Sequence, residues 1–200
     1  MRRGIPTGWD KLPRLKFSAP FFFKLIYLLL MVALYKNKYR VESARLRDWD
    51  YSIPWWYYIT ICTKDMKQWL GEVVERKMIL NDIGKIIDEE WKRTEKVRQN
   101  VELDYYQIMP NHLHGIIIIN GPDVVETHGH ASLRISKNNL SHIIRGFKGS
   151  CTMRIRTASL KSFSWQSRFY DHIIRNDKDL YRIRKYIYKN PIEWELDEYY

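Results

Sequence analysis

The pattern of apolar and polar residues along the chain predicts four strands and a short hairpin. Residues 55–63, WWYYITICT, are rich in β-forming side chains and predict a strand. Residues 101–109 and 112–120 predict two more strands, joined by a tight turn at Pro110-Asn111. Three shorter segments complete the pattern: a hairpin at 69–79, a loop at 121–132 and a strand at 169–175.

Apolar residues at helical spacing predict three helices. The first follows Asn81, whose side chain can cap it, and the second covers about 138–156. The third begins at Asn176 or Asp177 and ends just before Pro191, because proline disfavours helical geometry in the residue before it. The stripes expected in the core are Ile83, Ile86, Ile87 and Trp91 in the first helix, Leu140, Ile143, Ile144, Phe147, Cys151 and Ile155 in the second, and Leu180, Ile183 and Ile187 in the third.

Apart from the short hairpin, the elements follow the order strand, helix, strand, strand, helix, strand, helix. A tight hairpin in the middle of such an order favours an antiparallel sheet. We therefore expect an α+β fold of ferredoxin or RRM type, a sandwich in which helices pack on one side of a sheet of four to five strands.

Residues 1–38 differ from the rest and are expected to be an appendage to a domain at 39–200. They are basic and apolar, but the uninterrupted apolar run at 25–35 is too short to span a bilayer. No signal-peptide cleavage site follows that run. We interpret the segment as upstream sequence translated from an early start, with Met31 as an internal alternative, rather than as a membrane anchor.

The charge distribution points to a polyanion as partner. The chain carries a net charge of +11, and residues 134–189 hold 14 basic but only 3 acidic side chains. Fourteen tyrosines and eight tryptophans accompany this charge. Because cations bind phosphates and flat rings stack on bases, the combination favours nucleic acid.

The two cysteines predict reduced thiols. Cys62 lies in an apolar strand-like run and Cys151 on the apolar stripe of the second helix. Neither has a partner at CxxC spacing, so we expect buried free thiols and a cytoplasmic protein.

Two histidines open the third predicted strand. Residues two apart in a strand point to the same face, so His112 and His114 project together while Leu113 points into the core. Neutral imidazole is a good metal ligand, and a divalent ion would remove the repulsion between two protonated rings. The spacing also fits two hydrogen-bonded histidines beside a turn. A second pair, His128 and His130, falls in the predicted loop, and we interpret it as loop polarity.

The third predicted helix offers further polar groups. Tyr186 and Asn190 stand four residues apart and therefore share a helix face. Taken singly, Tyr186 also fits packing at the edge of the apolar stripe, and Asn190 also fits a helix cap.

Five motifs between residues 39 and 195 are distinctive in combination. They are YRVESARLRDWDY (39–51), YYITICT (57–63), QIMPNHLHGIII (107–118), WQSRFYDHIIRN (165–176) and YIYKNP (186–191). Together they resemble the HUH-type single-tyrosine transposases of bacterial insertion sequences, and most closely the REP-associated tyrosine transposase branch. The specificity lies in the combination of the histidine pair with the two C-terminal motifs.

This resemblance implies an antiparallel sheet flanked by helices and a site with defined roles. Tyr186 would be the nucleophile, and His112, His114 and Asn190 would hold Mg²⁺ or Mn²⁺. The tyrosine hydroxyl would attack a phosphorus of single-stranded or hairpin DNA, leaving a 5′-phosphotyrosine bond and a free 3′ hydroxyl that can rejoin it. The implied protein is a monomer or homodimer without a small-molecule substrate.

Further residues are candidates for DNA contacts. Four basic residues lie on the exposed face of the second helix, where they also fit a merely solvated surface, and the others belong to the WQSRFYDHIIRN motif. Trp165 fits stacking on a base or packing, and His172 fits a place near the metal or a structural role. The DNA-binding candidates are Arg145, Lys148, Arg154, Arg156, Trp165, Gln166, Arg168 and Arg175.

Two other functions remain open from the sequence. One is a nucleic-acid-binding module of RRM type, a domesticated or decayed transposase that holds DNA without cutting it. The other is a small zinc hydrolase, which needs an acidic ligand that the histidine motif does not provide.

Overall fold

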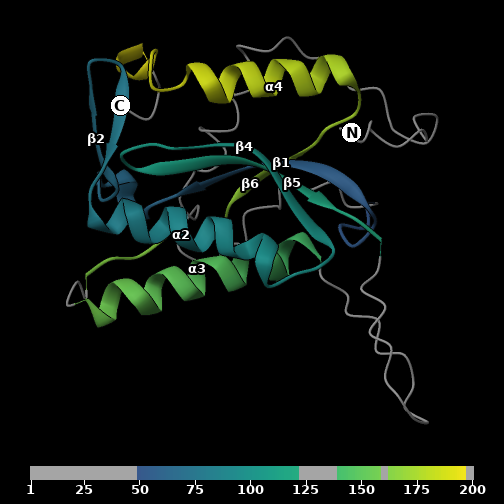
Figure 1. The fold of residues 1–200 in the computed structure, drawn as a ribbon, viewed down its shortest axis with the longest axis horizontal. Coiled ribbons are helices and arrows are strands. Elements are labelled where there is room, and N and C mark those ends of the chain that lie inside the picture. Colours follow the sequence, from purple (N-terminus) through teal and green to yellow (C-terminus); the bar gives the residue numbers. More distant parts are fainter. Residues whose placement is uncertain (1–48, 122–138, 159–161, 197–200) are drawn as a thin grey trace, which may run out of the picture. The chain divides into compact units, whose positions relative to one another are not determined.

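The computed structural model describes residues 49–121, 139–158 and 162–196 (Figure 1). The predicted appendage at 1–38 and the domain boundary at residue 39 lie outside these residues. The same holds for His128, His130 and almost all of the predicted loop at 121–132.

The described residues form every strand that the sequence predicts. The strands are β1 (Trp55–Cys62), β2 (Gly71–Val74), β3 (Lys77–Leu80), β4 (Val101–Ile108), β5 (His112–Ile119) and β6 (Tyr170–Ile173). Four of them form an antiparallel sheet in the order β4-β5-β1-β6, while β2 and β3 pair separately as a hairpin. With a helix between β1 and β4 and another between β5 and β6, this is the ferredoxin-like arrangement.

The three predicted helices are also present, and an asparagine caps the N-terminus of each. They are α2 (Asp82–Lys96), α3 (Leu140–Thr157) and α4 (Asp177–Lys189). The side chains of Asn81, Asn139 and Asn176 accept a hydrogen bond from the backbone N–H three residues later, which satisfies a donor that the helix leaves open. Asn176 is therefore the cap of the last helix. Two 3₁₀ turns, Lys64–Met66 and Trp194–Leu196, complete the described elements.

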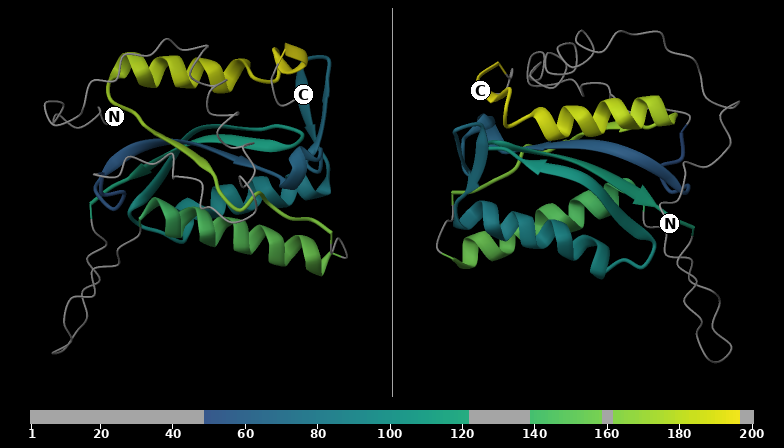
Figure 2. Two further views of the ribbon diagram at one scale, coloured as in Figure 1. Left: turned by 180° about the vertical axis from the view of Figure 1, so that it is seen from behind. Right: turned by 45° about the horizontal axis from the view of Figure 1, so that its top comes forward.

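Helices cover both faces of the sheet. A Cβ added at Gly115 of β5 would lie 2.5 Å from Cζ2 of Trp91, so this face packs against α2. The preceding residue, His114, points to the opposite face, where its ring centroid lies 5.2 Å from that of Tyr186 in α4. Figures 1 and 2 accordingly show α4 on one side of the sheet and α2 with α3 on the other.

The predicted α+β class and antiparallel sheet are confirmed. The position of α4 differs from the expectation that all helices pack on one side of the sheet, because α4 lies on the side opposite α2 and α3 (Figure 1). The reason lies in the strands themselves. All eight residues of β1 are buried, including those that point away from α2 and α3. A strand that is apolar on both faces needs cover on both, and α4 supplies the second layer.

The remaining predictions about burial hold except at Ile86, which is only half-buried in α2. The apolar stripe of α3 is buried as predicted, and Cys62 and Cys151 are buried thiols that are not part of a disulfide. Within the described ranges, no helix combines the length and hydrophobicity that crossing a bilayer requires.

Candidate active site

The histidine pair lies at the start of β5, on the face of the sheet that α4 covers. The antiparallel register places His112 opposite Cys62 and His114 opposite Thr60 on β1. Both imidazoles are buried, with 0% and 1% of their surface exposed. Their Nε2 atoms lie 2.9 Å apart, so the two rings converge on one point.

Asn111 sets the orientation of the first imidazole. Its amide nitrogen donates to the carbonyl oxygen of Met66 at 3.2 Å, which turns its amide oxygen toward Nδ1 of His112 at 2.8 Å. Because an amide oxygen only accepts, Nδ1 of His112 carries the proton and Nε2 carries the lone pair. That is the form in which the imidazole can bind a metal through Nε2.

Two hydroxyl groups of β1 hold the second imidazole. Nδ1 of His114 lies 2.8 Å from the hydroxyl of Tyr58 and 2.9 Å from that of Thr60. When one of these hydroxyls accepts from Nδ1–H, the lone pair of His114 is on Nε2, the form that can bind a metal there. Neither residue belongs to the histidine motif, and only the register between β1 and β5 reveals them.

Burial keeps both imidazoles neutral. Burial, with a smaller contribution from the charge of His114, lowers the pKa of His112 well below its ordinary value. Burial also lowers the pKa of His114 to about 3. The neutral rings are therefore available as ligands at physiological pH.

Tyr186 approaches the pair from α4. Its hydroxyl lies 3.4 Å from Nε2 of His114, and its ring stands edge-on to that of Tyr58, with centroids 6.5 Å apart. Asn190 follows one helical turn later, is buried, and caps α4 through its backbone N–H to the carbonyl oxygen of Ile187. The structure thus brings the tyrosine and both histidines together, and it places Asn190 next along the same helix.

The geometry of the histidine pair fits a divalent cation. Two ligand atoms about 2.1 Å from one octahedral ion, at right angles, lie about 3 Å apart. The observed 2.9 Å between the Nε2 atoms matches this separation. No cluster of three or more His, Cys, Asp or Glu side chains suited to a metal occurs among the described residues.

Comparisons with known proteins identify a relative and a similar fold. No family model matches the chain. An uncharacterised protein of Haemophilus influenzae is 34% identical over 170 residues, which cover 80% of this chain and 92% of that protein. The chain belongs to the family of this Haemophilus protein.

A solved structure shows which fold this family has. The structure of a REP-associated tyrosine transposase bound to a REP hairpin aligns with a TM-score of 0.51 and 21% identity, covering 78% of this chain and 77% of that chain. The fold is that of a REP-associated tyrosine transposase. The resemblance drawn from the motifs is therefore confirmed at the level of the fold.

In this REP-associated transposase fold, two of the predicted DNA-binding residues of α3 are engaged within the protein. The guanidinium of Arg154 pairs with Glu89 at 2.6 Å and Glu90 at 2.9 Å, which joins α3 to α2. The amine of Lys148 donates to the carbonyl oxygens of Gln166 and Arg168, both at 2.8 Å. Burial lowers the pKa of Lys148 to about 8.

Arg145 and Arg156 are exposed on α3, and Arg168 is exposed beyond it. The same helix buries its apolar stripe against the sheet face opposite Tyr186. Any contact of Arg145 or Arg156 with DNA would therefore lie away from the tyrosine itself.

Two residues of the WQSRFYDHIIRN motif, Trp165 and His172, make contacts within the fold. The ring of Trp165 packs edge-on against Phe163, with centroids 5.1 Å apart, and more obliquely against Phe147 at 6.0 Å. His172 contacts Asp179 at 2.8 Å, which links β6 to the first turn of α4. Gln166 and Arg175 are partly buried.

Proposed function

We propose that the protein is a metal-dependent DNA strand transferase that cleaves and rejoins single-stranded DNA beside a hairpin. The observation that carries the proposal is the 3.4 Å approach of the Tyr186 hydroxyl to Nε2 of His114. The hydroxyl of Tyr186 and two neutral imidazoles thus meet on one sheet face, and the buried Asn190 follows one helical turn later on α4. The REP hairpin held by the structural neighbour supports hairpin DNA as the partner.

The covalent step uses Tyr186 as nucleophile. A bond forms between its phenolic oxygen and the phosphorus, while the bond from that phosphorus to the 3′ oxygen breaks. The phenolic proton leaves Tyr186, and the departing 3′ oxygen takes up a proton. Attack by a 3′ hydroxyl on the phosphotyrosine reverses these changes and rejoins a strand.

His112, His114 and Asn190 are proposed as ligands of Mg²⁺ or Mn²⁺, which would supply Lewis-acid stabilisation of charge on the phosphate. Asn111, Tyr58 and Thr60 would orient the two imidazoles toward the ion. His114 is a poor proton acceptor for the phenol, because its pKa of about 3 keeps the ring from taking up a proton near neutral pH.

Binding of RRM type on the sheet is less well supported than cleavage. That mode stacks bases on exposed aromatic rings of the sheet. Here the rings of Tyr57 and Tyr58 on β1 are 0% and 1% exposed. With α2 and α3 on one face and α4 on the other, these rings are not available for stacking.

The test is formation of a covalent adduct. We expect the full-length protein, incubated with Mg²⁺ and single-stranded DNA from the flanks of its own gene, to form a protein–DNA band on a denaturing gel. Tyr186→Phe should abolish this band, because phenylalanine lacks the attacking oxygen, while hairpin binding stays within about twofold.

Tyr188→Phe provides the matched control. Tyr188 lies on the same helix but points outward, with 69% of its surface exposed. The Tyr188→Phe protein should form the adduct at the rate of the unsubstituted protein. An adduct that persists in Tyr186→Phe would show that another residue is the nucleophile.

A further inference from the structure

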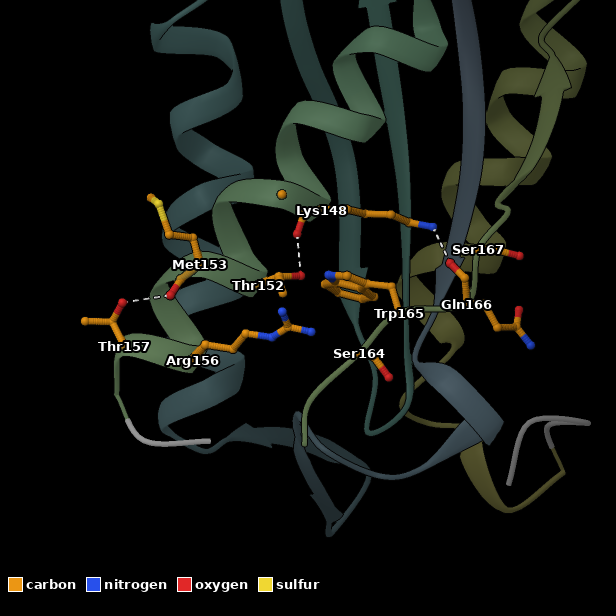
Figure 3. A pocket seen from close by; sticks show the side chains of 10 residues that line it. Lys148, Thr152, Met153, Arg156, Thr157, Ser164, Trp165, Gln166 and Ser167 are labelled. Carbon is orange, nitrogen blue, oxygen red and sulfur yellow. Dashed lines mark hydrogen bonds between the residues drawn. The ribbon is translucent and has the colours of Figure 1, made fainter. Parts of the chain in front are cut away.

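The open cleft beside α3 lies away from the candidate nucleophile. Figure 3 shows Thr152 and Arg156 lining this cleft from α3. Because α3 and α4 cover opposite faces of the sheet (Figure 1), the cleft does not reach Tyr186. The contacts that control the position of the tyrosine are therefore those of α4 itself.

Arg184 links α4 to the two strands on either side of β5. Its Nε donates to a carboxylate oxygen of Asp104 on β4 at 2.7 Å. The central carbon of its guanidinium lies 5.3 Å from the ring centre of Tyr105 on β4 and 5.8 Å from that of Trp56 on β1. Since β4 and β1 are the neighbours of β5 in the sheet, the cation lies over the strand that bears the histidine pair.

A β-bulge in β4 supplies two of these partners together. Residues 103–106 of β4 pair with residues 115–117 of β5, so three steps along one strand match two along the other. Adjacent residues of a regular strand point to opposite faces, and a bulge interrupts this alternation. Asp104 and Tyr105 lie in the bulge, and both contact the guanidinium of Arg184 on the face that α4 covers.

Arg184 and Tyr186 lie on opposite flanks of the apolar stripe of α4. At 3.6 residues per turn they are about 160° apart around the helix axis, with the buried Ile183 and Ile187 between them. Any rotation of α4 therefore moves both flanks together. A side-chain end about 6 Å from the axis moves by about 1 Å when the helix rotates by about 10°. A misplacement of about 1 Å can slow a reaction about a hundredfold.

We propose that Arg184 is a positioning residue, which fixes the rotation of α4 and so holds the hydroxyl of Tyr186 beside the histidine pair. This role rests on the proposed function, because its consequence is the rate at which Tyr186 attacks the phosphorus. The ion pair suits the role, since the side chains of Arg184 and Asp104 are only 27% and 16% exposed. Solvent screens such a pair less than it screens the exposed pairs of the surface.

The first test separates the rate of attack from binding. Arg184→Gln should slow adduct formation at saturating single-stranded DNA by about tenfold to a hundredfold. The affinity for the DNA should stay within about twofold, because the substitution acts on the position of the tyrosine. Loss of affinity with an unchanged rate at saturation would show that Arg184 binds a phosphate, and it would overturn the proposal.

Arg182→Gln is the matched control for this substitution. Arg182 lies two residues earlier on α4 and pairs with Asp179 of the same helix, so its ion pair does not join the helix to the sheet. The Arg182→Gln protein should form the adduct at the rate of the unsubstituted protein. Equal slowing by Arg182→Gln and Arg184→Gln would overturn the specific role of Arg184.

Asp104→Asn tests the link between the two charged residues. It keeps the shape of the side chain but removes its charge, so it should slow adduct formation as Arg184→Gln does. The double variant should be no slower than the slower single variant, because both substitutions break one contact. Losses that multiply in the double variant, or tighter DNA binding by Asp104→Asn, would overturn the link.

A third test follows the position of the Tyr186 ring without DNA or metal. The ring centres of Tyr186 and His114 lie 5.2 Å apart, so the tyrosine ring current shifts the ¹H signal of the His114 imidazole. The signal is assigned by its loss in His114→Gln, and Tyr186→Leu gives its position without the ring. We expect Arg184→Gln in EDTA to move the signal toward the Tyr186→Leu value, and Arg182→Gln to leave it in place. A signal that Arg184→Gln leaves fixed overturns the proposal.

Failure of this proposal can be told apart from failure of the proposed function. An adduct on Tyr186 together with a fixed His114 signal in Arg184→Gln leaves strand transfer intact and removes the role of Arg184. A shifted His114 signal in a protein that forms no adduct has the opposite meaning.

Discussion

At the level of single residues, the site holds two imidazoles in the neutral form, and their burial opposes protonation. His112 and His114 are buried, and their ring nitrogens face Asn111, Tyr58 and each other rather than water. The same burial that favours metal binding therefore makes the folded protein sensitive to acid.

The free energy of unfolding of the metal-free protein should fall as the pH drops below about 6.5. The pKa of both histidines is lowered in the folded state, so the unfolded chain takes up their protons first. The loss is about 1.4 kcal/mol per pH unit for each histidine, up to the point where the folded form also protonates. Urea unfolding in EDTA at pH values from 7 to 5 measures this slope.

His114→Gln should reduce the slope, because one of the two depressed groups is gone. His142→Gln is the control, since His142 lies on the exposed side of α3. A slope that His114→Gln leaves unchanged would show that other groups cause the acid sensitivity.

The proximity of the central residues could be predicted from the sequence, but the residues that contact them from β1 could not. The motifs named His112, His114 and Tyr186, and the structure brings these three together. The contacts of Tyr58 and Thr60 with His114 depend on the register between β1 and β5, and these residue pairs lie 56 and 54 residues apart in the chain. No local pattern encodes that register.

At the level of secondary structure, the decisive element is α4, which lies across the face that carries the histidines. Its amphipathic pattern indicates which side of the helix is buried, but not against which face of the sheet it packs. The long apolar runs of β1 and β5 did contain a signal, because strands buried on both faces lack alternation. The helix caps at Asn81 and Asn176, in contrast, depend only on residues nearby in the chain, so the sequence alone could predict them.

Gly115 is the position where β5 allows α2 to come close. A Cβ there would lie 2.5 Å from Trp91, whose ring is fully buried and cannot move aside. Gly115→Ala should therefore lower the free energy of unfolding by about 1–3 kcal/mol, as overpacked cores do. Chemical denaturation measures the change.

Gly149→Ala is the matched control for this substitution. Its added Cβ would meet no atom within 4 Å, and it lies in the interior of α3. Alanine should stabilise the helix there by about 0.5–1 kcal/mol. The opposite signs of the two changes separate the close contact with α2 from the general effect of removing a glycine.

At the level of the whole molecule, part of the excess positive charge is paired with acidic side chains of the protein itself. Residues 134–189 hold 14 basic and 3 acidic side chains, yet Arg154 pairs with Glu89 and Glu90 of α2. The sequence could show that the second half is basic, but not which of its cations are already compensated. Only the exposed ones can exchange their counterions for DNA phosphates.

Arg154 and Arg156, two residues apart on α3, allow this distinction to be measured. The logarithm of the single-strand binding constant should fall with the logarithm of the salt concentration by about 0.7 for each phosphate contact. Arg156→Gln should reduce that slope by about 0.7, because Arg156 is exposed on α3. Arg154→Gln should leave the slope unchanged and instead lower the free energy of unfolding by about 1–2 kcal/mol, since Glu90 is buried and loses a partner. If Arg154→Gln reduced the salt slope as much as Arg156→Gln, the charge of Arg154 would belong to the DNA surface and not to the contact between α2 and α3.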